Sequence, residues 1–172
     1  PYISVSVMVE AVFLTLGFEP GPLIRAVASK KLEGGCEIVV FTPSFRDDRA
    51  ERAWSDFNRI LSMMFEAKNV NVKRIIVDLT SFPRAVRNVK SVLEEYCDRS
   101  VAICLTGGMR ALVLAVYTSY LLVNWGKKPV VEVYLEGRGY SLTVPDVSRI
   151  LVSELSEERG KILKLLLKRS MS

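Results

Sequence analysis

The stretch VEAVFLTL, residues 9–16, decides the fold class of this chain. It is a short apolar and β-branched run that Gly17 closes, which is typical of a buried strand. A second run of this kind, CEIVVFT at residues 36–42, is stopped by Pro43. Segments with helical spacing of their apolar residues separate such runs. Strands that are apolar throughout, rather than alternating, indicate a parallel sheet covered by helices on both faces.

The same alternation continues along the chain. We expect further strands at residues 72–78 and 101–105, a hairpin of 130–135 and 140–144 joined at 136–139, and helices at 23–32, 47–68, 82–96 and 107–125. Gly34 and Gly35 are expected to end the first helix, and Asp47 or Asp48 to cap the second. The last helix is strongly apolar and should be buried on most sides. The sequence thus predicts an α/β fold, a Rossmann-like three-layer sandwich with a mostly parallel sheet and a C-terminal β-hairpin.

A helical extension is expected to follow the hairpin, with a short helix at 146–155 and a second at 156–169. The second has an apolar face of Ile162, Leu163, Leu166 and Leu167 surrounded by cationic side chains. Such a face needs something to pack on. We expect either docking on the sheet domain or a partner chain, or a following domain that this polypeptide lacks.

Composition excludes several kinds of chemistry. The 172 residues are 49% hydrophobic and 25% charged, which fits one compact domain with a sizeable core. Histidine is absent, which excludes Ser-His-Asp, Cys-His and His-metal sites. The three cysteines lack CxxC spacing, and we expect no metal and no cofactor. The net charge of +5 suits an anionic ligand. No apolar run is long enough for a membrane span, so a soluble, cytoplasmic protein is expected.

Ligands of open parallel sheets bind at the carboxyl ends of the strands, near the point where strand order reverses. The most informative such segment is Thr106-Gly107-Gly108-Met109-Arg110. Two glycines between a strand and a helix expose the first N–H groups of the helix, where the helix dipole favours an anion, and Arg110 adds a fixed cation. The alternative is a tight strand-to-helix turn with Arg110 merely solvated. The dinucleotide fingerprint GxGxxG and the phosphate loop GxxxxGK[ST] are both absent.

The turn after the first strand is less specific by itself. Gly17 fits ordinary turn chemistry and Phe18 fits a core position, but an exposed aromatic side chain there could stack on a base. The ordinary interpretation of Arg25 is a solvated surface residue. No catalytic residue is assigned. The candidate ligand-binding residues are Thr15, Leu16, Gly17, Phe18, Arg25, Thr42, Pro43, Ser44, Thr106, Gly107, Gly108, Met109 and Arg110.

Two motifs resemble the CRISPR-associated Rossmann fold (CARF) family. They are TLGFEPGPLIR at residues 15–25, after the first strand, and LTGGMR at residues 105–110, after the fourth. The chain is most similar to archaeal regulators in which this domain precedes a winged helix-turn-helix. The resemblance implies a ligand-sensing domain at residues 1–145, and a linker with the first helix of a truncated winged helix-turn-helix at 146–172.

The resemblance also implies a function. Members of the family are homodimers that bind cyclic oligoadenylates, most often cyclic tetra-adenylate, in one symmetric pocket across the dimer interface. A two-fold symmetric dimer can offer each half of such a ligand the same glycine turn and arginine. This chain would then be the sensor of a CRISPR-associated transcription regulator. DNA would be bound only through a C-terminal domain that is missing here.

Two other interpretations stay open. The first is a metal-independent ring nuclease, in which a ribose 2′-OH attacks its own phosphate. Ring nucleases of the family read Thr-Leu-Gly-Thr-Ser-Pro-Gly at the first turn, whereas Glu19 stands here at the serine position. The glycine turn that often continues to lysine continues here to Met109 and Arg110, so binding is favoured over cleavage. The second is an α/β domain that binds an unrelated nucleotide or only a protein partner.

Overall fold

A six-stranded sheet in the order β3-β2-β1-β4-β5-β6 forms the centre of the molecule. The computed structural model describes residues 8–45, 47–66, 69–135, 138–145 and 161. The strands are β1 (Met8–Thr15), β2 (Lys31–Pro43), β3 (Asn71–Val77), β4 (Val101–Cys104), β5 (Val130–Leu135) and β6 (Tyr140–Thr143). All neighbouring pairs are parallel except β5 and β6, which form the expected antiparallel hairpin.

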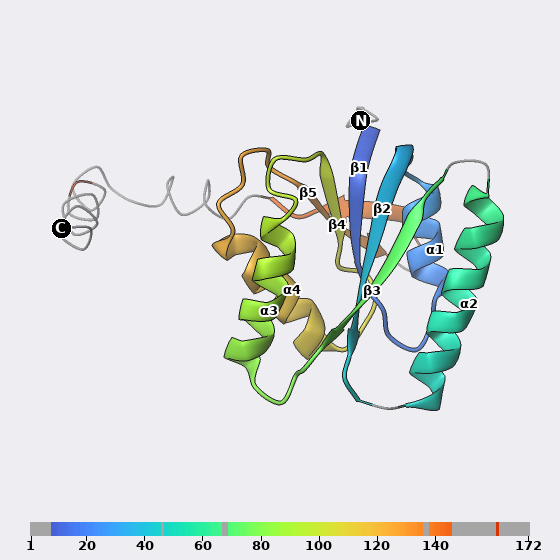
Figure 1. Cartoon of the computed structure of the whole chain (residues 1–172), viewed down its shortest axis with the longest axis horizontal. Coiled ribbons are helices and arrows are strands. Elements are labelled where there is room, and N and C mark those ends of the chain that lie inside the picture. Colours follow the sequence, from blue (N-terminus) through green and yellow to red (C-terminus); the bar gives the residue numbers. More distant parts are fainter. Residues whose placement is uncertain (1–7, 46, 67–68, 136–137, 146–160, 162–172) are drawn as a thin grey trace.

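Helices cover both faces of this sheet. They are α1 (Gly21–Ala28), α2 (Asp48–Phe65), α3 (Phe82–Glu94) and α4 (Arg110–Leu122). In Figure 1, α3 and α4 lie on one side of the sheet and α1 and α2 on the other. The α/β Rossmann-like sandwich with a mostly parallel sheet and a terminal hairpin is therefore confirmed. The expected helical extension at 146–172 lies outside the described residues, apart from residue 161.

Each central strand supplies side chains to two separate cores. Along β1, Phe13 packs with the α3 and α4 core, while Val12 and Leu14 pack with the α1 and α2 core. Because successive side chains of a strand point to opposite faces, an apolar residue is needed at every position. This explains why these strands are apolar throughout.

The sequence prediction was wrong about the end of α1. The helix ends at Ala28 rather than at residue 32, because the Ser29 hydroxyl donates to the Ala26 carbonyl and closes the last turn. Strand β2 then starts at Lys31, which pairs with Met8. The expected helix-ending glycines lie inside β2, where the register with β1 is interrupted and Gly35 has a φ of +82°.

Two expectations about α4 were also wrong. The helix begins at Arg110 rather than at residue 107, because Gly108 has a φ of +95° and Met109 an extended backbone. It is not buried on most sides, since Leu114, Leu121 and Leu122 are 57%, 46% and 56% exposed. By contrast, the expected cap of α2 is confirmed: the Asp47 carboxylate accepts a hydrogen bond of 2.8 Å from the Arg49 N–H.

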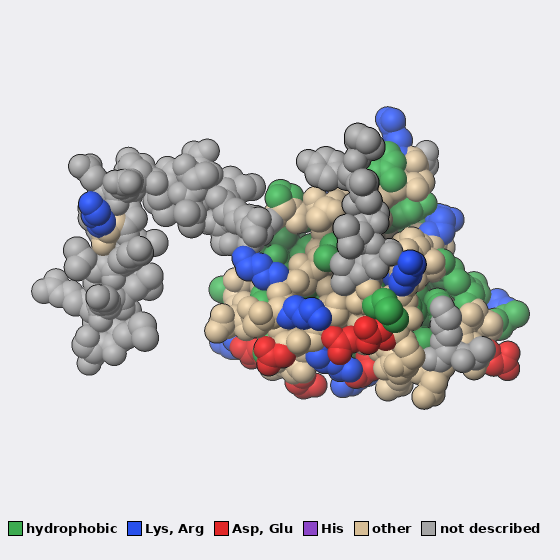
Figure 2. All heavy atoms as spheres, turned by 90° about the horizontal axis from the view of Figure 1, so that it is seen from above, with side chains coloured by type: hydrophobic (Ala, Val, Ile, Leu, Met, Phe, Trp, Pro, Cys, Tyr) green, Lys and Arg blue, Asp and Glu red, His purple; other side chains and the backbone are tan. Residues whose placement is uncertain are grey.

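The amino ends of the strands carry charges of both signs. Figure 2, which views the molecule from that end, shows acidic and basic side chains next to each other. Arg99 and Tyr96 both donate to the Glu37 carboxylate, at 2.7 and 2.8 Å. The Arg99 guanidinium first, and then the Tyr96 hydroxyl, hold the pKa of Glu37 below its usual range. These charges are therefore engaged with each other. Within the described part of the chain, no helix is long and apolar enough to cross a bilayer.

Candidate ligand-binding site

The point where strand order reverses lies between β1 and β4. From β1 the chain moves outward to β2 and β3, and then returns to place β4 on the other side of β1. The β1–α1 turn and the β4–α4 turn therefore leave adjacent strands at the same edge of the sheet. This is the position at which open α/β sheets bind ligands.

The two turns touch through their backbones. The Thr15 hydroxyl donates a hydrogen bond to the Gly107 carbonyl. A Cβ atom on Gly17 would lie 3.0 Å from the Gly108 nitrogen, and one on Gly107 would lie 2.9 Å from the Thr15 carbonyl oxygen. A side chain at either position would therefore require the facing backbone to shift. We refer to this contact of residues 15–17 with residues 107–108 as the glycine seam.

Gly108 meets two restrictions at once. Its φ of +95° is a conformation that side-chain-bearing residues rarely adopt, and its Cβ would lie 3.2 Å from that of Thr15. The positive φ turns the chain out of β4 so that α4 can begin at Arg110. This geometry is that of the tight strand-to-helix turn, which the sequence offered as the alternative interpretation of Gly107-Gly108.

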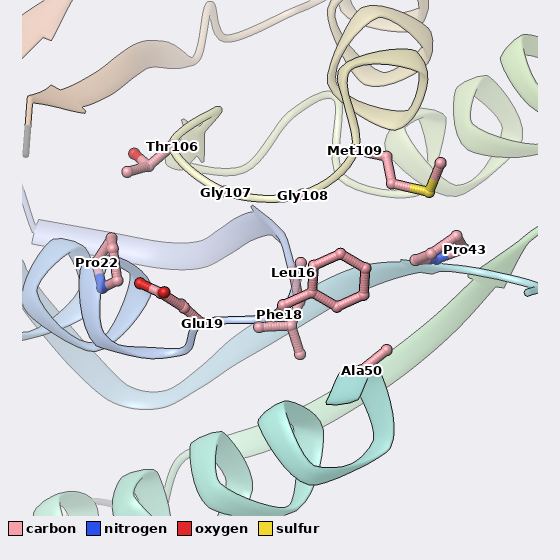
Figure 3. A pocket seen from close by; sticks show the side chains of 11 residues that line it. Leu16, Phe18, Glu19, Pro22, Pro43, Ala50, Thr106, Gly107, Gly108 and Met109 are labelled. Atoms are coloured by element: carbon pink, nitrogen blue, oxygen red, sulfur yellow. The ribbon is translucent and has the colours of Figure 1, made fainter. Parts of the chain in front are cut away.

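A pocket of about 430 Å³ opens along the glycine seam. Its size lies within the roughly 300–1,000 Å³ that is usual for small-molecule sites. Figure 3 shows the Gly107-Gly108 turn on one side and Leu16, Phe18 and Glu19 on the other. Its lining residues come from the turns after β1 and β4, from the last residue of β2 and from the starts of α1 and α2: Leu16, Gly17, Phe18, Glu19, Pro22, Pro43, Ala50, Thr106, Gly107, Gly108 and Met109.

The start of α4 lies next to this pocket and has no side-chain cap. The N-cap residue of α4 is Met109, which lines the pocket and cannot accept a capping hydrogen bond through its side chain. The cap residue therefore provides no side-chain acceptor for the first N–H groups of this 13-residue helix, and the helix dipole makes this end partly positive. This end of the pocket is suited to an anion.

Phe18 is an exposed aromatic side chain in the pocket wall. Its ring is 47% exposed, and the guanidinium of Arg49 lies 4.2 Å from the ring centroid. Arg49 is itself held by Asp47, with distances of 3.3 Å and 3.1 Å to the two carboxylate oxygens. These bonds lower the pKa of Asp47, which therefore stays ionised.

The interpretation of Phe18 as a core residue does not hold. Sequence reasoning missed Arg49, because nothing in the pattern brings the start of α2 to the first turn.

Eight of the thirteen candidate residues line the pocket, and five lie around it. Thr15 is buried in the glycine seam. Thr42 is buried and accepts a hydrogen bond from Arg74, while Ser44 is exposed beyond β2. Arg25 is exposed, 5.7 Å above the Tyr134 ring, and Arg110 is exposed at the first position of α4.

Three lining residues were not among the candidates, namely Glu19, Pro22 and Ala50. Glu19 and Pro22 belong to the first-turn motif, so their position was available as a signal. Ala50 had none, because a small residue in the first turn of a helix is common in any sequence. Among the described residues, no group of three Cys, Asp or Glu side chains is placed to hold a metal ion.

Solved structures of other proteins share this fold. Can2 from Sulfobacillus thermosulfidooxidans, in complex with cyclic tetra-adenylate, is 14% identical with a TM-score of 0.52, over 79% of this chain and 37% of that one. Enterococcus italicus Csm6, bound to cyclic hexa-2′-fluoro-hexa-dAMP, is 10% identical with a TM-score of 0.58, over 94% of this chain and 45% of that one. This chain therefore spans less than half the length of either protein.

A search of curated proteins finds no match. The family model of the Csa3 CRISPR-associated Rossmann-like domain, in contrast, matches residues 10–145. That range includes every helix and strand described above except the first two residues of β1, and it includes both glycine turns. The resemblance to the CARF family is thereby confirmed, and the chain belongs to the family of Csa3 CRISPR-associated Rossmann-like domains.

Proposed function

We propose that this domain senses a cyclic oligoadenylate, namely cyclic tetra-adenylate, by binding it in the pocket along the glycine seam. The observation that carries the proposal is the pocket itself: two backbone turns at the strand-order reversal combine a helix N-terminus with an exposed aromatic ring. An anion-binding end and a stacking face are what a nucleotide requires. Two proteins of this fold were solved with cyclic oligonucleotides of this class.

The proposed binding unit is a homodimer. A ring of four nucleotides is larger than the 430 Å³ of one pocket, so each of two symmetric pockets would take half of it. The exposed leucines of α4, Leu114, Leu121 and Leu122, lie on the helix that begins directly after the pocket residue Met109. An apolar helix face of this kind is typical of a surface that a partner covers. Pairing through it would bring the two pockets together.

The proposed output is transcription regulation. In the regulators that this chain resembles, the domain is joined to a winged helix-turn-helix, and ligand binding across the dimer would change the spacing of the two DNA-reading helices. A protein that joins this domain to such a reader should change its affinity for promoter DNA when the cyclic oligoadenylate is added. A gel-shift titration with and without the ligand tests this step separately from ligand binding.

The central test uses radiolabelled cyclic tetra-adenylate with the protein. Retention on a filter measures binding, and chromatography of the recovered nucleotide measures cleavage. We expect retention of an intact ligand. Recovery of linear products would instead support the ring nuclease, and the absence of retention would remove the proposal.

Arg110→Ala is the informative variant. Arg110 stands at the first position of α4 and is exposed, so its loss should weaken binding roughly tenfold while thermal stability stays the same. Arg59→Ala is the matched control, because Arg59 is an exposed arginine of α2 nine residues beyond the lining residue Ala50. Equal losses in the two variants would show that Arg110 acts only through net charge.

A further inference from the structure

Among the described residues that line the pocket, Glu19 is the one with a charged side chain. It is exposed, and no hydrogen bond or ion pair joins it to another described residue. Figure 3 shows its carboxylate near Pro22, at the end of the pocket away from Met109. A carboxylate only accepts hydrogen bonds and repels phosphate. The part of a nucleotide at this end must therefore donate a hydrogen bond and carry no negative charge.

Thr106 supplies a complementary group at the same end of the pocket. Its hydroxyl oxygen accepts a hydrogen bond of 2.9 Å from the Tyr134 N–H. Its hydroxyl hydrogen has no acceptor among the described residues, so it can be donated to a ligand. Figure 3 places Thr106 and Glu19 near Pro22, with Phe18 between them and Met109. This end therefore offers one acceptor and one donor beside an aromatic face.

The pocket is thus polarised along its length. The start of α4, at Met109, offers backbone donors for a phosphate, and the opposite end offers Glu19 and Thr106. Adenine has a single N–H donor group, its exocyclic amine, which lies between the acceptors N1 and N7. A base stacked on Phe18 would place this amine toward Glu19 and a ring nitrogen toward Thr106.

We propose that Glu19 binds the exocyclic amine of adenine, and thereby fixes the direction in which each nucleotide lies in the pocket. This inference rests on the proposed function, because it names the residue that recognises the adenine base of the proposed cyclic oligoadenylate. Glu19 acts here as a specificity residue for binding. Its neighbour Phe18 provides the stacking surface. Stacking on Phe18 discriminates only weakly between bases, because every base has a π-face.

The test is a double comparison by calorimetry. The wild-type protein and Glu19→Ala are each titrated with cyclic tetra-adenylate and with the same ring in which unsubstituted purine replaces adenine, so that only the amine is missing. A hydrogen bond to a charged acceptor corresponds to roughly tenfold in affinity or more. We expect wild-type protein to prefer the adenine ring by about this factor and Glu19→Ala to bind both rings within about threefold. Glu95→Ala, which removes the same charge from an exposed position at the far end of α3, should keep the wild-type preference.

The outcomes separate the two proposals. Wild-type protein that binds neither ring removes the proposed function, and this inference with it. Wild-type protein that binds both rings equally leaves the proposed function standing and overturns the role of Glu19. An unchanged preference for adenine in Glu19→Ala overturns it as well. Because Glu19 makes no hydrogen bond or ion pair with a described residue, the melting temperature of Glu19→Ala should match that of the wild type. This measurement confirms that the comparison is made on folded protein.

Discussion

Replacing Gly108 by alanine should cost stability in two separable ways. The residue has a φ of +95°, and an added Cβ would lie 3.2 Å from that of Thr15. Holding a side-chain-bearing residue in such a conformation costs about 1–3 kcal/mol. Crowding against a packed neighbour adds about 1 kcal/mol or more. We therefore expect Gly108→Ala to lower the free energy of unfolding by about 2–4 kcal/mol, a large part of the 5–15 kcal/mol of an ordinary domain.

The chain contains controls that separate the two contributions. Gly35 has a φ of +82° with no atom within 4 Å of an added Cβ, so Gly35→Ala measures the backbone cost alone. Gly34 has neither a positive φ nor a close atom, so Gly34→Ala should be neutral or slightly stabilising. Urea unfolding of the three variants gives the free energies. If Gly108→Ala were no less stable than Gly35→Ala, the glycine seam would not be packed as described.

Three further predictions follow from other parts of the molecule. The lowered pKa of Glu37 stabilises the folded protein above pH about 4.3, the pKa of an unfolded glutamate, and this stability should be lost progressively as the pH falls below it. Glu37→Gln should lack this part of the acid sensitivity when urea unfolding is compared at pH 7 and pH 3. The same pH dependence in both proteins would contradict the role of Arg99 and Tyr96 in holding that carboxylate. Burial raises the pKa of the Cys36 thiol to about 11 and that of the Cys104 thiol to about 12. Maleimide at pH 8 should therefore modify the half-buried Cys97 first, which mass spectrometry can show. Early labelling of Cys104 would mean that β4 is accessible. If the proposed dimer forms through α4, Leu114→Glu should abolish it in light scattering. The melting temperature of the monomer should stay within a few degrees, because Leu114 is 57% exposed. A dimer that survives would exclude this face of α4 as the interface.

The sheet was predictable because its signal is local. A strand such as VEAVFLTL needs apolar side chains on both faces, and Phe13 and Leu14 do pack in two different cores. The start of α4 was not predictable from periodicity, since residues 107–125 are compatible with a helix throughout. It is set by the contact of Gly108 with Thr15, which lies 93 residues away in sequence.

The candidate site was predictable to a similar degree. Strand ends mark the residues that reach one edge of the sheet, and eight of the thirteen candidates line the pocket. The sequence does not tell which side chains turn away from it. Arg25 lies over Tyr134, and Thr42 is bonded to Arg74. Both depend on partners from strands that are distant in sequence, so no local pattern reveals them.

The construction of the pocket separates stability from selectivity. The glycine seam is held by backbone contacts and by the hydrogen bond from Thr15 to Gly107, and it leaves little room for an added side chain. The side chains of Phe18 and Glu19 project from the first turn without supporting the core, since both are exposed. If Glu19 binds the base as proposed, a change at Glu19 would alter which base is accepted while the fold stays intact, whereas a change at Gly108 affects the fold first. On the proposed function, such an arrangement would keep one binding position at the sheet edge and let a few exposed residues determine the ligand.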